Sequence, residues 1–308
     1  MNRRQFSRNL AGVALGAAAL GKSYPFSGGG PLAEGEGPGV PFKLSVMLWT
    51  VFGDLPFEER LAKVAEAGYK NVELVGEYKK WSENDFKKAL AKKNELGLNF
   101  DVTAGLGHGV GDPGARDALM ADVRNELPIM ERLECPAVII MSGNVVAGMP
   151  RAQQHESCIE GLKRASALVE GKKIAGHPVR LLLENIDPEE NPKYYLQSVA
   201  EGFEVVEAVQ HPQVQFLYDF FHEQISEGNL IAKLEKNIDH VGLVHIADVP
   251  GRHEPGTGEI NYANIYRKLA QLKYNRYAAM EFLPTGDPVA QLRAARQEVL
   301  AIARGYGD

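Results

Sequence analysis

The sequence has few of the features that mark several classes of protein. Among its 308 residues there are two cysteines, Cys135 and Cys158, whose spacing matches neither a disulfide framework nor a zinc motif. We interpret them as two buried, apolar thiols. Acidic residues outnumber basic ones, the net charge is −6, and no long basic tract occurs. Nothing in the charge pattern therefore indicates a nucleic-acid partner.

Signatures of nucleotide and phosphate binding are also missing. No Gly-x-Gly-x-x-Gly turn follows the first strand-like run, where LWTVFGDLPF stands instead. This disfavours a doubly wound open sheet. Gly251, Gly256 and Gly258 form a glycine-rich loop, but no Lys follows at the spacing of a P-loop.

The N-terminus carries a short apolar run behind a basic start. The run, residues 10–20, is too short to span a bilayer comfortably and fits the core of a signal peptide. The preceding pair Arg3–Arg4 resembles a twin-arginine export signal. We therefore expect an export signal and a flexible lead-in rich in Gly and Pro over residues 1–40, and a periplasmic location. No membrane span is expected once the signal is processed.

From about residue 41 onward, short apolar runs alternate with helical patterns. The helical patterns have apolar residues at i, i+3 and i+4, as at Leu61, Val64 and Ala65. The strand-like runs begin near residues 42, 71, 98, 137, 179, 214, 240 and 277. The helix-like segments are residues 57–67, 82–96, 114–133, 151–173, 196–209, 227–237, 262–272 and 288–304. This alternation requires parallel pairing through crossover helices. Because eight such units match a (β/α)8 barrel, we predict an α/β fold, a single-domain TIM barrel over residues 41–308.

Four consecutive strand-like runs end on side chains that can bind a metal. These side chains are Glu184, Asp219, His245 and Glu281. A single His at such a place is more often a hydrogen-bonded core residue, but Asp and Glu are rarely buried unless paired or bound to metal. Active sites of TIM barrels lie at the carboxyl ends of the strands. We therefore expect these residues to share one site.

The residue types indicate a reaction class. Three carboxylates and one imidazole suit a divalent ion such as Mn²⁺, Mg²⁺ or Co²⁺, with Zn²⁺ as the alternative. An ion held there polarises a carbonyl and its neighbouring hydroxyl, and so acidifies the C–H between them. Glu184 and Glu281 can flank that carbon as base and acid. The pattern predicts proton abstraction next to a carbonyl, through an enediolate, on a small-molecule carbonyl or sugar substrate.

Five segments resemble the hydroxypyruvate isomerases of the xylose isomerase-like TIM barrel superfamily, which also contains ketose 3-epimerases. The most specific segment is HIADVPGRHEPGTGEINY at residues 245–262. The others are YDFFHEQISEGNL at 218–230, LLLENID at 181–187, AMEFLP at 279–284 and PFEERLAKVAEAGYKNVEL at 56–74. The resemblance covers essentially everything from Leu44 onward.

The resemblance implies roles for individual residues. The implied metal ligands are Glu184, Asp219, His245 and Glu281. Glu184 and Glu281 would also be the acid–base pair, and His222 would bind a substrate oxygen. Arg252 would meet a substrate carboxylate or hydroxyl, which a guanidinium can hold by two parallel hydrogen bonds. Glu190 lies about where the epimerases place a substrate-binding glutamate.

Some positions depart from the isomerase pattern and leave the substrate open. His245 stands where the typical isomerase has Gln and the epimerases have His, and the loop around His108 also differs. Together with the export signal, this leaves three reactions open: isomerisation of a small hydroxy-keto acid, epimerisation of a ketose at C3, and a lyase reaction on a keto-glycoside in the periplasm.

Trp49 and Glu73 end the first two strands and can line the pocket, but we do not assign them to the catalytic set. The sequence does not determine the oligomeric state, for which a homodimer and a tetramer are the options.

Two other functions are disfavoured by the sequence. A non-catalytic sugar-binding module would be expected to have lost one of the four ligand positions, and all are filled. A DNA-repair endonuclease of the same superfamily would need about three metals in a cluster rich in His, and a basic face for phosphates. Only His245, His222 and His108 fall near the predicted barrel mouth, and the net charge is negative.

Overall fold

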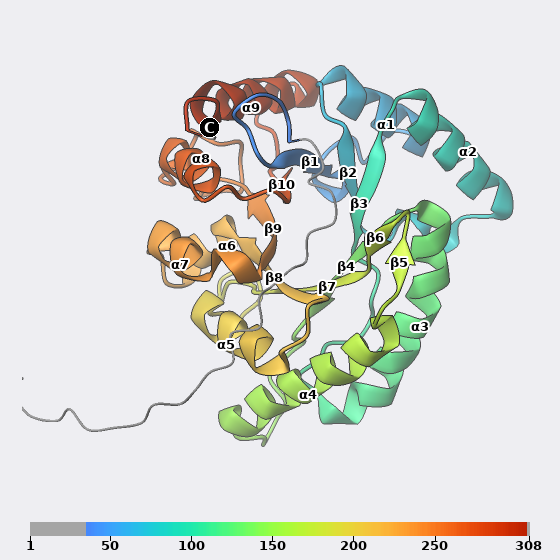
Figure 1. Cartoon of the computed structure of the whole chain (residues 1–308), viewed down its shortest axis with the longest axis vertical. Helices are drawn as coiled ribbons and strands as arrows, with labels where there is room; N and C mark the ends of the chain where they lie inside the picture. The colour runs from blue at the N-terminus through green and yellow to red at the C-terminus, as the bar shows by residue number, and fades with distance from the viewer. Residues whose placement is uncertain (1–34, 307–308) are drawn as a thin grey trace, which may run out of the picture.

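The computed structural model describes residues 35–306. Of the signal and flexible lead-in expected over residues 1–40, residues 1–34 lie outside the described part, whereas the end of the lead-in packs against the barrel: Val40 is buried, and Glu36 pairs with Arg296 at 2.8 Å. Eight parallel strands close into a barrel in the order β1-β10-β9-β8-β7-β4-β3-β2, with helices around the outside (Figure 1). The strands are β1 (Lys43–Met47), β2 (Asn71–Leu74), β3 (Asn99–Thr103), β4 (Ala137–Met141), β7 (Arg180–Glu184), β8 (Val214–Asp219), β9 (Val241–Ile246) and β10 (Tyr277–Met280). The predicted (β/α)8 barrel is confirmed.

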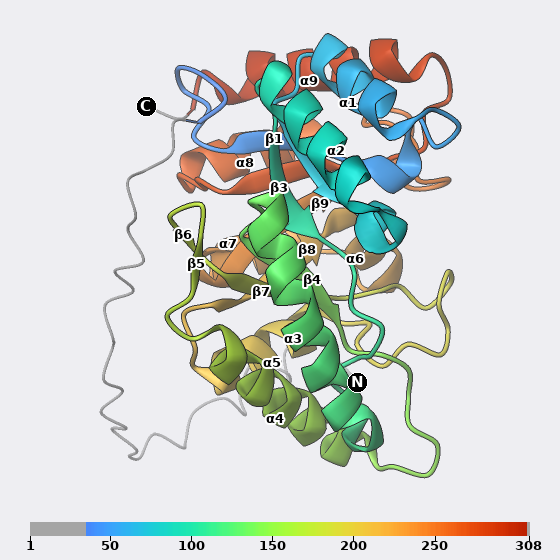
Figure 2. The ribbon, with the colours of Figure 1, turned by 90° about the vertical axis from the view of Figure 1, so that its right-hand side faces the viewer.

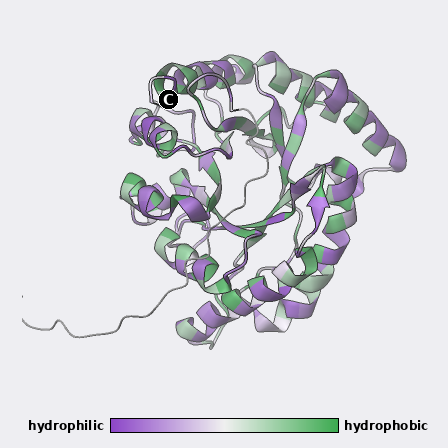
Figure 3. Ribbon diagram, viewed as in Figure 1, coloured by the Kyte–Doolittle hydropathy of each residue, from purple (hydrophilic) through white to green (hydrophobic). Residues whose placement is uncertain are grey.

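The outer helices are amphipathic, with apolar residues toward the barrel. In α1, Leu61 and Val64 are buried whereas Glu59 and Glu66 are exposed, and polar and apolar residues alternate around the other helices (Figure 3). The α-helices are α1 (Phe57–Glu66), α2 (Glu83–Glu95), α3 (Arg116–Leu133), α4 (Arg151–Val169), α5 (Val199–Val209), α6 (Phe220–Ser226), α7 (Leu230–Asn237), α8 (Tyr262–Gln271) and α9 (Pro288–Ala303). Short 3-10 helices are η2 (Leu48–Thr50), η3 (Glu77–Lys80), η4 (Pro113–Ala115) and η5 (Ile238–His240). Within residues 35–306, no helix combines the length and apolar character needed to cross a membrane.

The segment between α4 and β7 contains a small hairpin that the sequence pattern did not predict. The helix expected over residues 151–173 ends at Val169, and β5 (Lys173–Ile174) then pairs antiparallel with β6 (His177–Pro178). Gly171 has a φ of +68°, a conformation that glycine adopts readily and that commonly follows the end of a helix. The hairpin projects beside the barrel in Figure 2.

The sixth unit contains two helices where the sequence predicted one over residues 227–237. Helix α6 starts directly after β8, because the Asp219 side chain accepts a hydrogen bond from the His222 backbone N–H at 3.1 Å and caps it. Gly228 and Asn229 both have positive φ angles and separate α6 from α7. Asp219 therefore ends a strand and begins a helix.

A closed layer of apolar side chains fills the barrel below its carboxyl end. This cluster consists of Met47, Val102, Ala137, Ile139, Leu182, Leu217, Leu243 and Ala279. Successive side chains of a strand point to opposite faces, so residues two apart share a face. The residues two positions beyond Leu182, Leu217, Leu243 and Ala279 therefore also point into the barrel, at its mouth. These are the four ligand candidates predicted from the sequence.

One close approach between a helix and a strand gives a stability prediction. A Cβ atom added to Gly202 of α5 would lie 2.2 Å from Phe216 Cε2 of β8. Because both atoms are in the core, Gly202→Ala should lower the free energy of unfolding by about 1–3 kcal/mol. Gly53→Ala is the control, since an added Cβ there meets nothing within 4 Å. Denaturant unfolding of both variants checks this, and equal unfolding midpoints would contradict it.

Candidate active site

The four ligand candidates meet at the mouth of the barrel. Glu184 and Asp219 are the last residues of β7 and β8, His245 is the penultimate residue of β9, and Glu281 follows β10 directly. Each offers one ligand atom, and these atoms all lie within 4.8 Å of one another. All four side chains are buried. The structure thus brings together residues that are up to 97 positions apart in the chain.

Several atoms of this cluster have no hydrogen-bond partner among residues 35–306. They are Asp219 Oδ2, His245 Nδ1 and Glu281 Oε2. His245 Nδ1 lies 2.8 Å from Glu281 Oε2 and 3.5 Å from Glu184 Oε1. Unpartnered buried polar atoms are costly, and a divalent cation between them would satisfy all of them at once. A set of three carboxylates and one imidazole fits such an ion, so this cluster can hold a metal ion.

His245 is oriented by a residue that the sequence interpretation left outside the catalytic set. Its Nε2 lies 3.0 Å from Oε2 of Glu73, which is fully buried at the end of β2. A carboxylate on one ring nitrogen holds the proton there and leaves the other nitrogen free as a ligand. The only sequence signal for Glu73 was an acid near the end of a strand-like run.

Charges around His245 and Glu281 move their pKa values in opposite directions. Burial alone would lower the pKa of His245, but the charges of Glu281 and Glu73 outweigh it and raise that pKa well above its usual value. Burial alone would raise the pKa of Glu281, but the charges of Arg252 and His245 hold it well below the usual value. Burial raises the pKa of Glu184. The site therefore favours an ionised carboxylate at Glu281.

Glu281 is held from two sides. Trp49 donates its indole N–H to Glu281 Oε1 at 2.8 Å, and Arg252 Nη2 lies 2.8 Å from Glu281 Oε2. The Arg252 guanidinium also lies over the rings of Trp49, at 5.3 Å, and Phe221, at 4.8 Å. Cation–π contacts with two aromatic rings favour this position of the guanidinium. Trp49 thus lines the site, as the sequence allowed.

The three residues expected to bind substrate lie around the same centre. His222 Nε2 is 3.5 Å from Asp219 Oδ2, and its Nδ1 donates to Asp187 Oδ2 at 2.5 Å. Burial alone would lower the pKa of His222, but the Asp219 charge and the Asp187 hydrogen bond raise it to about 9. Arg252 Nη1 pairs with Glu190 Oε2 at 2.9 Å. Asp187, which orients His222, was not singled out from the sequence.

Other residues weighed from the sequence lie apart from this cluster. His108 is partly exposed and its Nδ1 lies 2.8 Å from Asp122 Oδ2. Cys135 and Cys158 are both free and buried, as expected for structural thiols. Of these three residues, none belongs to the four-residue cluster.

The contact between Glu73 and His245 gives a prediction for metal binding. In Glu73→Gln the side chain keeps its shape but loses its charge, so it should hold the imidazole less firmly. We expect the affinity for Mn²⁺ to fall by about 10–100-fold, the usual cost of losing an outer partner of a ligating histidine. Competition with a fluorescent chelator measures this. An unchanged affinity would show that Glu73 does not orient the ligand.

Known proteins are similar to this chain in fold and in sequence. The family model described as Xylose isomerase-like TIM barrel matches residues 61–302. A 2-oxo-tetronate isomerase from Haemophilus influenzae is 33% identical over 255 residues, covering 81% of this chain and 96% of that protein. The hydroxypyruvate isomerase of Escherichia coli is 26% identical over 257 residues, covering 82% of this chain and 97% of that protein.

A solved structure from Brucella melitensis, described as an AP endonuclease, family 2, is similar with a TM-score of 0.73 and 27% identity. The similarity covers 81% of this chain and 96% of that one. The family resemblance inferred from the five sequence segments is therefore confirmed. The chain belongs to the xylose isomerase-like TIM barrel family.

Proposed function

We propose that this protein is a divalent-metal-dependent isomerase of a small hydroxy-keto acid or keto sugar. The observation that carries the proposal is the convergence of Glu184, Asp219, His245 and Glu281, whose ligand atoms lie within 4.8 Å of one another. Three buried atoms of this cluster make no hydrogen bond among residues 35–306. The two relatives named as isomerases of 2-oxo-tetronate and hydroxypyruvate support the same class of substrate. A metal ion bound at this point would polarise a carbonyl and its neighbouring hydroxyl, and so acidify the C–H between them.

The two glutamates are placed to move the proton. Glu184 extends from β7 and Glu281 follows β10, so they approach the mouth of the barrel from different strands. One carboxylate removes the proton from the hydroxyl-bearing carbon, and a carboxylate then returns a proton to the former carbonyl carbon. The hydroxyl proton passes to the former carbonyl oxygen, so atoms and charge balance. The apolar layer that contains Leu217 and Leu243 closes the site from below.

Arg252 and His222 would orient the substrate. Arg252 contacts the rings of Trp49 and Phe221, and its guanidinium can hold a carboxylate or a hydroxyl of the substrate. His222, held by Asp187, can donate Nε2–H to a substrate oxygen. Both side chains are buried, so these contacts would form away from bulk water.

A ketose 3-epimerase is the second candidate. It is favoured by His245, which the resemblance associates with the epimerases, and by Glu190, which pairs with Arg252 at 2.9 Å. In an epimerase the same two glutamates would remove and return a proton at opposite faces of one carbon, and the carbonyl would stay in place. Export to the periplasm, expected from residues 1–40, would fit a free sugar or keto-glycoside and remains part of the proposal.

Product analysis separates the candidates. The Mn²⁺-loaded protein is incubated with hydroxypyruvate, D-fructose and methyl 3-keto-glucoside, and the products are identified by chromatography and mass spectrometry. An isomerase moves the carbonyl, an epimerase inverts one hydroxyl, and a lyase releases the methyl group as methanol. A chelator-treated sample should show none of these changes. Equal conversion with and without metal would contradict the proposal.

A further inference from the structure

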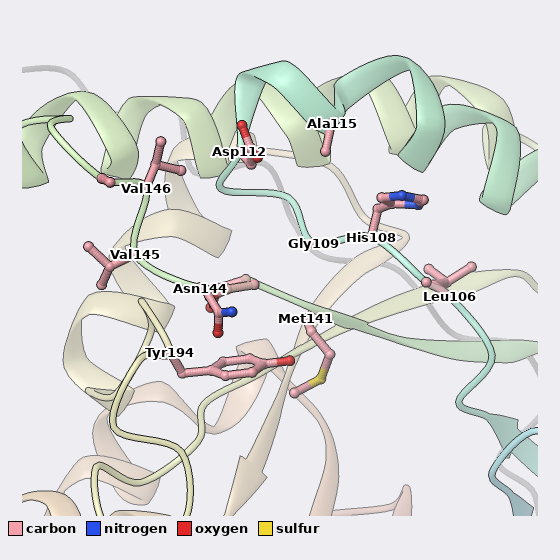
Figure 4. Close-up of a pocket in the computed structure, with 14 residues that line it drawn as sticks. Leu106, His108, Gly109, Asp112, Ala115, Met141, Asn144, Val145, Val146 and Tyr194 are labelled. Carbon is pink, nitrogen blue, oxygen red and sulfur yellow. The ribbon is translucent and has the colours of Figure 1, made fainter.

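A cavity lies next to the four-residue centre. It has a volume of about 520 Å³ and is formed by the loops that follow β3, β4 and β7 (Figure 4). Its lining residue Met141 pairs in register with Glu184 on the neighbouring strand. No member of the four-residue centre lines the cavity. Its volume lies within the range of about 300–1,000 Å³ that is usual for ligand pockets, and a three-carbon keto acid bound at the centre would not need it.

The walls of the cavity are tied together by backbone hydrogen bonds. Val110 N–H donates to Met141 O at 2.9 Å, which joins the loop after β3 to the end of β4. Val145 N–H donates to Lys193 O at 2.8 Å, and Asn144 forms an antiparallel bridge with Tyr194. These contacts join the loop after β4 to the loop after β7. The cavity is therefore preformed, which lowers the entropic cost of binding a ligand there.

Free polar groups face the cavity. The Asn144 amide and the Tyr194 hydroxyl line it, and Figure 4 shows both side chains in the space between the loops. Neither group makes a hydrogen bond to the part of the chain that the structure describes; the contacts of these two residues are made by their backbone. His108 contacts Asp122 through Nδ1, so its Nε2 is left for a ligand. These groups can bind hydroxyls.

The apolar and charged residues that line the cavity limit the chemical class of ligand that it can bind. Met141, Leu106 and Val145 also line the cavity, and they can contact the C–H faces of a sugar ring or carbon chain. The lining residues include Asp112 but neither Lys nor Arg. A phosphate or carboxylate would meet no Lys or Arg there and would lie near the Asp112 carboxylate, so the cavity suits a neutral group with several hydroxyls.

We propose that this cavity is a subsite for the distal, uncharged and hydroxylated part of a keto sugar or keto-glycoside whose reacting carbons lie at the four-residue centre. The inference rests on the proposed function and narrows its substrate class to molecules longer than three carbons. Asn144 and Tyr194 are then residues that determine specificity, and they take no part in the proton transfer.

The test compares a short substrate with long ones. We measure kcat/KM for hydroxypyruvate, D-fructose and methyl 3-keto-glucoside with the wild type, Asn144→Ala and Tyr194→Phe. Each variant should lower the ratio of kcat/KM for the preferred long substrate over hydroxypyruvate by about tenfold, as expected when one neutral hydrogen bond is lost. Asn94→Ala on α2 and Tyr306→Phe carry the same substitutions outside the cavity and should leave the ratio unchanged.

Binding without turnover separates this inference from the proposed function. Calorimetry with D-fructose and methyl 3-keto-glucoside is performed on Glu281→Gln, alone and combined with Asn144→Ala or Tyr194→Phe, at Mn²⁺ concentrations raised until elemental analysis shows equal metal content in every sample, because Glu281 is itself one of the ligand candidates. If no substrate turns over but the cavity variants still weaken binding about tenfold, the subsite stands and the proposed reaction fails. If the cavity variants change neither the substrate ratio nor the binding, or if neither sugar binds, the inference is wrong.

Discussion

Glu281→Gln should lower kcat by about 10²–10⁴-fold, the range expected when a general acid or base is removed. Glutamine keeps the shape of the side chain, and its amide oxygen can still accept the indole N–H of Trp49, which lies 2.8 Å from Glu281 Oε1. It cannot accept a proton at the substrate carbon, and it lacks the charge that pairs with Arg252. Because Glu281 is also one of the four ligand candidates, bound Mn²⁺ is measured in the same samples and kcat is compared at equal metal content. Steady-state kinetics with the preferred substrate from the panel measures the effect.

Glu235→Gln is the matched control for this change. Glu235 is exposed on α7 and pairs with Lys268 at 3.1 Å, a surface contact worth about 0–1 kcal/mol. The control should therefore fold and react like the wild type. If Glu281→Gln kept more than about a tenth of the wild-type kcat, far above the range for a lost acid or base, its assignment to the acid–base pair would be wrong.

Asp219→Asn should nearly abolish metal binding while the protein stays folded. Asn can still cap α6, because its side-chain oxygen can accept the His222 N–H as Asp219 Oδ1 does at 3.1 Å. The other side-chain atom becomes an amide nitrogen, which has no lone pair to offer a cation. We expect the Mn²⁺ affinity to fall by more than about 100-fold, beyond the usual loss for an outer-shell partner. Equilibrium dialysis followed by elemental analysis measures bound metal.

The structure offers a control with the same chemistry at another helix. Asp287 caps α9 by accepting the Ala290 N–H at 2.8 Å, and Asp287→Asn should keep both the cap and the metal. Circular dichroism of both variants reports whether they are folded. A folded Asp219→Asn protein that retained stoichiometric metal would show that Asp219 is not a ligand.

The positions of the four ligand candidates could be predicted because each lies at or near the end of an apolar, strand-like run, and the carboxyl ends of the strands meet at the mouth of a TIM barrel. In the pairs Leu182 and Glu184, and Leu243 and His245, an apolar residue in the barrel is followed two positions later by a polar residue at its mouth. The same repeat of eight strand and helix units fixed the fold class. Local spacing was sufficient for both conclusions.

Other features depend on contacts that local spacing does not encode. Glu73 meets His245 although 172 positions separate them, and only closure of the barrel brings β2 and β9 to one mouth. The cavity beside the centre is formed by loops joined through backbone hydrogen bonds, which carry no residue-type signal. Helix α6 was missed because its N-cap, Asp219, also ends β8, and the sequence pattern assigned Asp219 to the strand alone.

Hydrogen exchange at the substrate carbon tests the central claim most directly. The protein is loaded with Mn²⁺ or treated with chelator, incubated in D2O with each substrate of the panel, and deuterium in the recovered substrate is measured by mass spectrometry. We predict that at least one substrate takes up a single deuterium next to its carbonyl, and that the uptake requires both the metal and Glu281. A protein with bound metal that exchanges no substrate hydrogen, or one that exchanges it equally well in Glu281→Gln, would contradict the account.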